Sequence, residues 1–331
     1  MKIFLAHTPP MRANYYGERA LSALREIGEV HLNDGDEVLS GAALTEAAAG
    51  CAVIVADRMT PGTAQTFERA PDLVAFLRCA VDVSTIDIDA ASREGILVTQ
   101  ATPGFGISVA EMGIGYMVDL ARGISRSVVD YRAGRQPEAR MGRQLAGSSV
   151  GIVGYGEIGR RLAGLAHALG MRVLVSDPYT RVDVDAYQQV SMDALLAQAD
   201  FVVCLVVATA ETENLFGAAT FRQMKRGAYF INLSRGQLVD EGALAAALND
   251  GVIEGAAMDV GRALDQQPSL QLAQRPDVIA TPHTAGLTPA AVEHQAFDTV
   301  EQVRALAEGR LPQGALNVGA ATRLERLGIN R

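Results

Sequence analysis

Two short segments of the sequence carry side chains that could bind and protonate a small carbonyl compound. In Asn232–Gln237, Arg235 follows an apolar run that reads as a strand. A planar guanidinium can hold a carboxylate through two parallel hydrogen bonds and polarise the neighbouring carbonyl. In Thr281–Gly286, His283 follows the last predicted strand. Because histidine is the usual residue for moving a proton near neutral pH, the pair indicates acid–base chemistry on an organic acid. The alternative for Arg235 is a surface charge at a strand end.

Neither segment is expected to hold a metal ion. The sequence has no His, Cys or carboxylate set with ligand spacing. Its three cysteines lie in apolar surroundings without a CxxC pair, which is typical of reduced core residues. The four histidines other than His283 are predicted to be structural.

A glycine-rich turn near the middle of the chain predicts a dinucleotide site. Val150–Gly159 reads as a strand, a tight turn and a helix start. The first glycine would allow the turn, the second would let the backbone approach a pyrophosphate, and the third would let the helix pack on the strand. The helix N-terminus would favour the phosphate charge. The turn residues predicted to bind the cofactor are Gly154, Tyr155, Gly156, Glu157, Ile158 and Gly159.

An acid after the next predicted strand indicates which dinucleotide is bound. Arg172–Ser176 ends at Asp177. One helix and one strand return the chain to the same sheet edge, where the carboxylate can accept hydrogen bonds from the adenosine ribose. A carboxylate there also repels a 2′-phosphate, so we expect NAD rather than NADP. The alternative is a glycine-rich turn in some other α/β protein.

Two series of alternating strands and helices must position these residues. The strand candidates are residues 3–6, 52–56, 74–77 and 96–99 in the first series, and 150–153, 173–176, 201–207, 229–233, 255–260 and 278–280 in the second. A helix from about residue 108 is expected to extend to residue 132. Such alternation predicts parallel, doubly wound sheets with ligands at the carboxyl ends of the strands.

The last predicted helix, residues 289–308, follows the final strand of the second series and does not belong naturally to the second sheet. We therefore expect it to cross back to the first domain. This gives a discontinuous substrate-binding domain of residues 1–104 and 288–331, with an NAD-binding domain of residues 105–287 inserted into it.

Composition excludes several classes of protein. The 331 residues are 49% hydrophobic and 20% charged, as in ordinary globular proteins. A net charge of −9 argues against nucleic acid as a partner. We find no secretory pattern and no apolar segment that could span a membrane, so a cytoplasmic location is expected.

Several motifs, in this order and spacing, resemble the D-isomer-specific 2-hydroxyacid dehydrogenase family. They are Gly142–Gly147, the segment GIVGYGEIG, Asp177–Pro178, Asn232–Gly236, Ala257–Val260 and Thr281–His283. The resemblance covers about residues 75–310. It implies an α/β protein of two Rossmann-like, doubly wound parallel-sheet domains with a cleft between them, NAD(H) as cofactor, and a homodimer made through the cofactor domain.

The resemblance also implies roles for single residues. Arg235 would hold the 2-oxo acid, and His283 would be the general acid in reduction. Asp259 would contact the nicotinamide end of the cofactor, with Leu233 and Ser234 also in the cofactor site. The loop that holds the substrate carboxylate would be Ala80, Val81 and Asp82.

Two positions depart from the family pattern. The family places a glutamate, which supports the protonated histidine, where this chain has Leu264; Asp265 is one position later. Asp265 could support the protonated histidine after a small loop shift, another acid could support it, or no carboxylate is used; we favour Asp265. Without such a partner, the fraction of His283 that is protonated would become small near neutral pH. The second departure is Asp82, at an expected glycine: it faces solvent, or the substrate bears a cationic group.

The sequence therefore predicts an NAD(H)-dependent oxidoreductase that interconverts a 2-oxo acid and a D-2-hydroxy acid. We expect it to act mainly as a reductase, with glyoxylate, hydroxypyruvate or another 2-oxo acid. The alternative is an NAD(H)-sensing binding protein on the same scaffold, with little or no catalysis.

Overall fold

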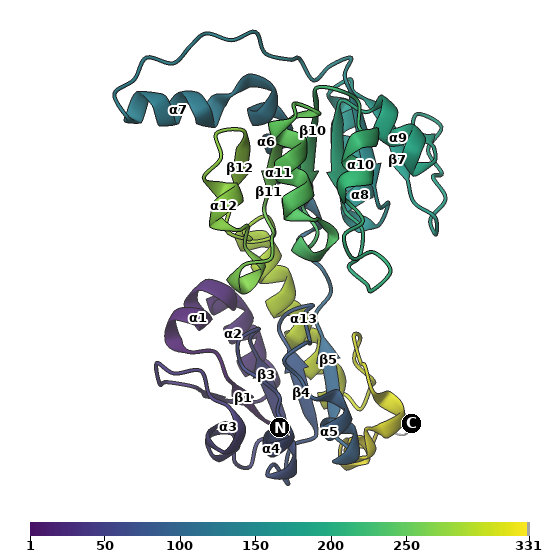
Figure 1. Cartoon of the computed structure of the whole chain (residues 1–331). Coiled ribbons are helices and arrows are strands. Elements are labelled where there is room, and N and C mark those ends of the chain that lie inside the picture. Colours follow the sequence, from purple (N-terminus) through teal and green to yellow (C-terminus); the bar gives the residue numbers. More distant parts are fainter. Residues whose placement is uncertain (330–331) are drawn as a thin grey trace. The chain divides into compact units, whose positions relative to one another are not determined.

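The computed structural model describes residues 1–329, which form two compact units. One unit is Met1–Gly104 together with the chain from Thr288 onward, and the other is Phe105–Leu287. Each contains one parallel sheet with helices on its faces (Figure 1). The α/β class with two parallel sheets, as expected from the alternating pattern, is confirmed.

The sheet of the first unit has the order β2-β1-β3-β4-β5, with every neighbour parallel. Its strands are β1 Lys2–Leu5, β2 Glu29–Leu32, β3 Val53–Ala56, β4 Ala75–Arg78 and β5 Leu97–Gln100. Its helices are α1 Pro9–Tyr15, α2 Glu18–Ile27, α3 Gly41–Ala47, α4 Ala64–Glu68, α5 Ile88–Arg93, α13 Pro289–Ala307, η3 Val318–Ala320 and η4 Thr322–Leu327. The strand order reverses between β1 and β3, so both strands end where parallel sheets usually bind ligands.

The last long helix, α13, belongs to the core of this first unit. Its buried residues Val300 and Val303 pack with Ile3 and Leu5 of β1. Within this unit the Tyr16 hydroxyl also lies 3.1 Å from the Thr299 hydroxyl of α13. Residues from the two ends of the chain therefore share one hydrophobic core. In Figure 1 the yellow-green ribbon of α13 lies beside the purple and blue ribbons of the first strands and helices.

The sheet of the second unit has the order β12-β11-β10-β9-β6-β7-β8, again parallel throughout. Its strands are β6 Ser149–Val153, β7 Arg172–Ser176, β8 Gln188–Gln189, β9 Phe201–Cys204, β10 Ala228–Asn232, β11 Ile253–Met258 and β12 Val278–Ala280. Its helices are α6 Gly106–Arg122, α7 Ile124–Arg132, α8 Glu157–Ala168, α9 Met192–Gln198, α10 Ala218–Gln223, η1 Gly236–Leu238, α11 Glu241–Asn249, η2 Leu264–Gln266 and α12 Leu270–Ala273. The order reverses between β6 and β9, and the glycine turn follows β6.

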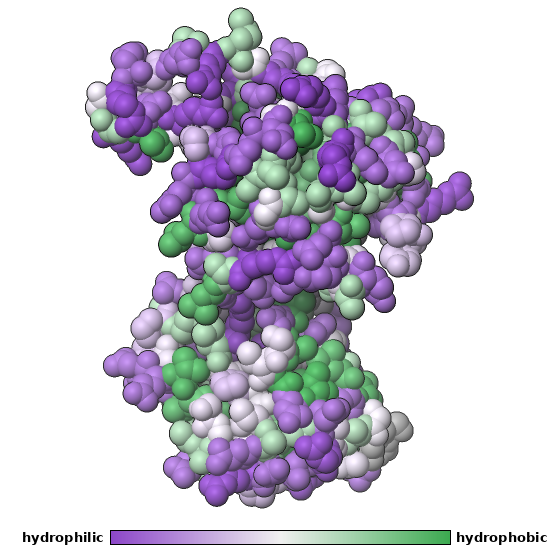
Figure 2. All heavy atoms as spheres, in the orientation of Figure 1, coloured by the Kyte–Doolittle hydropathy of each residue, from purple (hydrophilic) through white to green (hydrophobic). Residues whose placement is uncertain are grey.

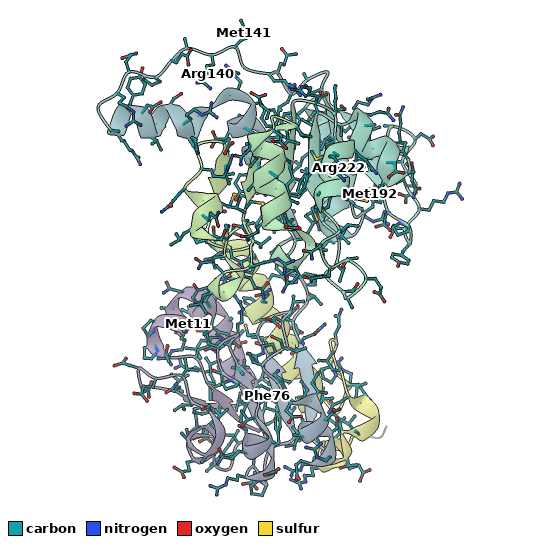
Figure 3. All side chains as sticks on the ribbon, viewed as in Figure 1. Met11, Phe76, Arg140, Met141, Met192 and Arg222 are labelled. Carbon is teal, nitrogen blue, oxygen red and sulfur yellow. The ribbon has the colours of Figure 1, made fainter. Side chains whose placement is uncertain are left out.

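The predicted helix from residue 108 to residue 132 is not continuous. Gly123 takes a left-handed conformation with φ +64° and ends α6, after which α7 begins at Ile124. A left-handed glycine satisfies the last carbonyls of a helix and turns the chain. The loop after α7 carries Arg140 and Met141, and in Figure 3 their side chains point away from the ribbon.

The surface seen in Figure 2 is mixed, with hydrophilic residues spread over both units. Among residues 1–329 no helix combines the length and the apolar character that a membrane span requires.

Candidate active site

The glycine turn has the backbone that a pyrophosphate site requires. Gly154 has φ +101°, and a Cβ there would lie 2.6 Å from the Leu205 carbonyl oxygen. A Cβ on Gly159 would lie 2.3 Å from the Gly154 oxygen. By contrast, apart from its own neighbours in the chain, no atom of the described residues lies within 4 Å of the Cβ position of Gly156. Two glycines therefore permit close packing, while the third leaves the backbone open to a ligand.

Asp177 lies at the carboxyl end of β7 and is bonded to the same turn. Its Oδ2 accepts the Tyr155 N–H at 2.7 Å, and its Oδ1 accepts the N–H groups of Tyr179 and Thr180, each at 2.8 Å. Burial alone would raise the pKa of Asp177, but these donors together hold it below its ordinary value. The carboxylate is therefore ionised near neutral pH. The open glycine, the helix start and this acid fit NAD.

Arg235 is an exposed residue in the loop that leaves β10. Asn232 fixes this loop, because its side-chain amide donates to the Arg235 carbonyl at 2.9 Å and accepts the Ser234 N–H at 3.1 Å. The Ser234 hydroxyl donates to the Val206 carbonyl beyond β9. The backbone at Arg235 is thus held on two sides by side-chain hydrogen bonds.

Two glycines bring the β10 and β11 loops into contact. A Cβ on Gly236 would lie 2.0 Å from the Gly261 oxygen, and a Cβ on Gly261 would lie 2.4 Å from the Pro268 Cα. Arg262 ties the same loops together by donating to the Gln237 carbonyl at 2.8 Å. Sequence reasoning assigned Arg262 no role.

His283 lies in the loop that follows β12, and one residue holds this loop. The buried Asp259 carboxylate accepts the Thr281 hydroxyl, the Thr284 N–H at 2.9 Å and the Ala285 N–H at 2.9 Å. The His283 N–H donates to the Asp259 carbonyl, also at 2.9 Å. His283 itself has φ +56°, a left-handed conformation that costs a non-glycine residue about 1–2 kcal/mol. These bonds hold it there.

The imidazole of His283 contacts Asp265 through the main chain. Its Nδ1 lies 3.2 Å from the Asp265 carbonyl oxygen. A carbonyl only accepts, so Nδ1 carries a hydrogen and Nε2 is the nitrogen that can exchange a proton. Asp265 and Gln266 both have positive φ, at +55° and +57°. Leu264, at the position where the family has glutamate, is 93% exposed.

Arg235, Asp259 and His283 therefore follow three adjacent strands, β10, β11 and β12, of one parallel sheet. The glycine turn and Leu233–Ser234 lie at the same sheet edge. No group of His, Cys, Asp and Glu in residues 1–329 could hold a metal ion.

The predicted substrate loop lies in the first unit, after β4. The Ala80 carbonyl accepts the Ala101 N–H at 3.0 Å. Asp82 is partly exposed, and its Oδ1 accepts the Ser84 N–H at 2.9 Å, an Asx-type turn. Val81, between them, is also partly exposed.

A buried polar cluster at the carboxyl edge of this first sheet was missed. His7 follows β1, Asp57 follows β3 and Arg78 ends β4, and each is 2% exposed or less. Arg78 donates to the Asp57 carbonyl and to the Thr85 hydroxyl. Burial lowers the pKa of Arg78 to about 10 and that of His7 to about 4, although Asp57 opposes both shifts. Each of these residues, taken alone, looks like an ordinary polar group at a strand end. The sequence therefore gave no indication that they form a buried cluster.

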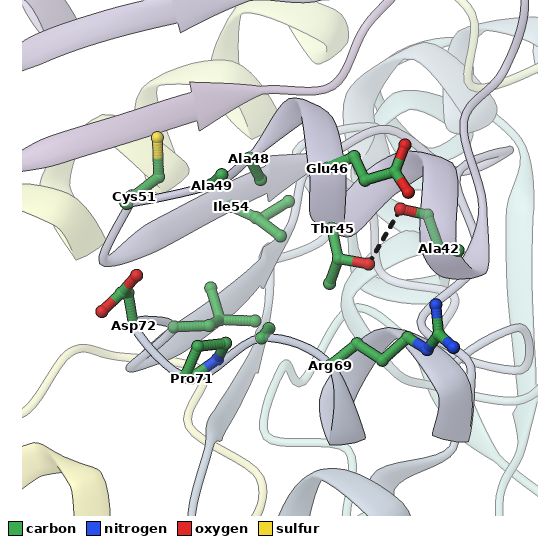
Figure 4. Close-up of a pocket in the computed structure, with 13 residues that line it drawn as sticks. Ala42, Thr45, Glu46, Ala48, Ala49, Cys51, Ile54, Arg69, Pro71 and Asp72 are labelled. Atoms are coloured by element: carbon green, nitrogen blue, oxygen red, sulfur yellow. Dashed lines mark hydrogen bonds between the residues drawn. The ribbon is translucent and has the colours of Figure 1, made fainter.

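The cavity shown in Figure 4 lies at the opposite edge of the first sheet. Its volume is about 470 Å³, and it is lined by α3 and by the segments that enter β3 and β4, including Cys51, Ile54 and Leu73. Parallel sheets bind ligands at the carboxyl ends of their strands, so this cavity is not the candidate site.

Comparisons with known proteins agree with this arrangement. Residues 114–285 match the family description "D-isomer specific 2-hydroxyacid dehydrogenase, NAD binding domain". The chain belongs to this family. It is 32% identical over 308 residues to D-3-phosphoglycerate dehydrogenase of Methanocaldococcus jannaschii, covering 91% of this chain and 58% of that protein. It is 32% identical over 309 residues to glyoxylate reductase of Korarchaeum cryptofilum, covering 91% and 93%.

Among solved structures, the D-isomer specific 2-hydroxyacid dehydrogenase of Lactobacillus delbrueckii ssp. bulgaricus, in its NAD complexed form, aligns with a TM-score of 0.81 and 26% identity. The alignment covers 96% of this chain and all of that one. The cofactor of this family's NAD-binding domain is therefore NAD, as the sequence predicted. The chain spans about half the length of the first curated relatives it matches.

Proposed function

We propose that this chain is a 2-oxo acid reductase that uses NADH to reduce acids such as glyoxylate or hydroxypyruvate to 2-hydroxy acids, giving the D-isomer wherever C2 of the product is a stereocentre. The observation that carries the proposal is that Arg235 and His283 follow β10 and β12, which flank β11 at the sheet edge that also bears the glycine turn. An anion-binding side chain and a proton donor would thus lie at the same edge as the nucleotide site.

The cofactor supplies a hydride when it is bound. The residues that would hold it are the turn Gly154–Gly159, Leu233 and Ser234, with Asp177 at the ribose and Asp259 at the nicotinamide end. Their backbone and acidic groups match a dinucleotide without a 2′-phosphate.

Arg235 would bind the carboxylate of the substrate and polarise its carbonyl. His283 would give its Nε2 proton to the carbonyl oxygen, because Nδ1 is held by the Asp265 carbonyl. Asp265 thereby orients the imidazole, and its carboxylate would favour the protonated ring. Ala80, Val81 and Asp82 would bind the substrate carboxylate through main-chain N–H groups. Replacement of Asp82 by glycine tests whether its charge selects among substrates.

A homodimer made through the second unit is part of the proposal. Helix α7 exposes apolar side chains in a single chain, among them Ile124, Val129 and Tyr131, which are 50%, 59% and 62% exposed. Several exposed apolar side chains on one short helix are typical of a subunit contact. Sedimentation equilibrium measures the mass directly.

The experiment that tests the function measures NADH binding and NADH consumption separately. The chain has no tryptophan, so the enhancement of NADH fluorescence on binding is read without energy transfer from that residue. We expect NADH to bind, and to be consumed with at least one acid in a panel of glyoxylate, hydroxypyruvate, pyruvate and bulkier 2-oxo acids. If NADH binds but is consumed with no acid of the panel, the alternative of an NAD(H)-sensing protein is favoured. The observation that supports this alternative is Leu264, which stands where the family has a glutamate.

A further inference from the structure

The loop that carries His283 is held by an internal chain of hydroxyl groups that begins on α6. Tyr116 is a buried residue of this helix, and its hydroxyl is hydrogen-bonded to the Thr281 hydroxyl. The Thr281 hydroxyl is in turn hydrogen-bonded to Oδ1 of Asp259. Buried Tyr116 on α6, half-buried Thr281 after β12 and buried Asp259 after β11 thus form one connected line within the second unit.

The direction of these bonds follows from the groups themselves. Near neutral pH a carboxylate only accepts, so the single hydroxyl hydrogen of Thr281 points to Asp259. Thr281 then has only lone pairs to offer Tyr116, and the phenol must donate. Burial raises the pKa of Tyr116, and the Asp259 charge adds to the effect, so the phenol keeps its proton at any working pH.

The chain ends on the segment that places the proton donor. Asp259 is 2% exposed, and the donors it accepts from Thr281, Thr284 and Ala285 all lie within two residues of His283. A buried carboxylate is stable only while such donors satisfy it. Loss of one donor therefore loosens the same loop that holds His283 in its left-handed conformation.

We propose that Thr281 and Tyr116 are positioning residues, which fix His283 through Asp259. The proposal deepens the proposed function and rests on it where it concerns turnover. Neither side chain needs to touch the substrate. Thr281 acts directly on the carboxylate, and Tyr116 acts one bond further away, so removal of the Thr281 hydroxyl should have the larger effect.

The first test uses the protein without cofactor or substrate. Thr281→Val keeps the shape of the side chain and removes the hydroxyl. We expect amide hydrogen exchange at Thr284 and Ala285 to become about tenfold faster, which corresponds to about 1.4 kcal/mol of lost protection. Tyr116→Phe should accelerate it by about threefold. Thr220→Val is the matched control, because the Thr220 hydroxyl donates to the Leu215 carbonyl elsewhere in the unit; it should leave exchange at Thr284 and Ala285 unchanged.

The second test measures reduction of whichever 2-oxo acid is turned over. Thr281→Val should lower kcat about tenfold and change the KM for the acid and the Kd for NADH less than threefold, and Thr281→Ser should restore kcat. Unchanged exchange in Thr281→Val overturns the inference. Faster amide exchange with an unchanged kcat also overturns the inference, because loosening the loop would then have no effect on proton transfer from His283. If the wild-type protein reduces no acid, the proposed function fails while the exchange result still decides whether the hydroxyl chain holds the loop.

Discussion

His283 is oriented by a carbonyl where relatives are expected to use a carboxylate side chain. The Asp265 main-chain oxygen lies 3.2 Å from Nδ1, and Asp265 reaches it in a left-handed conformation. Two contributions of one residue can therefore be tested separately: that of the carbonyl, which contacts the ring, and that of the negative side chain, which we propose acts on its charge.

For Asp265 we predict different results from two substitutions. Asparagine adopts positive φ readily, so Asp265→Asn should keep the wild-type kcat at low pH. The upper pH limit for reduction should fall, because the negative charge is lost. Asp265→Val resists positive φ and should lower kcat more than tenfold at every pH. The pH dependence of kcat/KM measures both. Unchanged profiles in both variants would remove Asp265 from the site.

The residues of the site that were predicted lie in short sequence motifs. The contacts that were missed join residues far apart in the sequence. Arg235, His283 and the glycines each follow a recognisable apolar strand, so their placement could be read locally. The contact between Tyr116 and Thr281 spans 165 positions, and the tyrosine lies in a helix with no local mark of function. Only the packing of α6 on the sheet brings them together.

Elements were predicted well where burial makes an apolar run. The bounds of β12 agree with the structure, the candidate for the buried strand β3 began one residue early, and that for β4 was shifted by one residue. The edge strands β2 and β8 were missed because their residues are polar or half-exposed. The candidate at residues 201–207 was too long, since β9 ends at Cys204 and the apolar residues after it belong to the loop next to Gly154.

Close contact between the β10 and β11 loops gives a prediction at the scale of elements. Gly236→Ala would place a methyl group 2.0 Å from the Gly261 oxygen, so the two loops must separate. We expect the free energy of unfolding to fall by about 2–4 kcal/mol and the KM for the 2-oxo acid to rise, because Arg235 moves with its loop. Denaturant unfolding and steady-state kinetics measure these effects.

Gly115→Ala is the matched control, because outside the chain neighbours and the nearby backbone of α6 no described atom lies within 4 Å of that Cβ position. It should leave kinetics unchanged and add up to about 1 kcal/mol of stability. A Gly236→Ala variant as stable and active as this control would show that the two loops do not depend on their contact.

At the scale of the molecule, His7 links pH to stability. It is fully buried, and among residues 1–329 neither ring nitrogen has a hydrogen-bond partner. Burial lowers its pKa to about 4, although Asp57 opposes the shift. As pH falls from about 6.5 to about 4, the unfolded chain therefore binds a proton that the folded chain does not. This contribution to stability is complete above that window and is lost as pH falls through it.

We predict that His7→Phe retains the wild-type free energy of unfolding at pH 7, because no hydrogen bond of the ring is lost and an aromatic ring still packs against Tyr16. Between about pH 6.5 and pH 4 the variant should lose less stability than the wild type. Urea unfolding at several pH values gives both quantities. A variant weaker at pH 7 by more than about 2 kcal/mol would indicate that His7 bonds to a buried group or water.

The central claim is that this member of the family moves a hydride between NADH and a 2-oxo acid, with Arg235 and His283 as the groups that bind and protonate the acid. The most direct measurement supplies NADH carrying deuterium at both C4 positions of the nicotinamide ring, together with the best acid of the panel whose product has a stereocentre at C2, and analyses the product by mass spectrometry and chiral chromatography. The account predicts one deuterium at C2 of the D-isomer, with the yield reduced at least a hundredfold in Arg235→Ala and His283→Asn while NADH binding persists. An L-isomer, a product without deuterium, or no product despite bound NADH would contradict it.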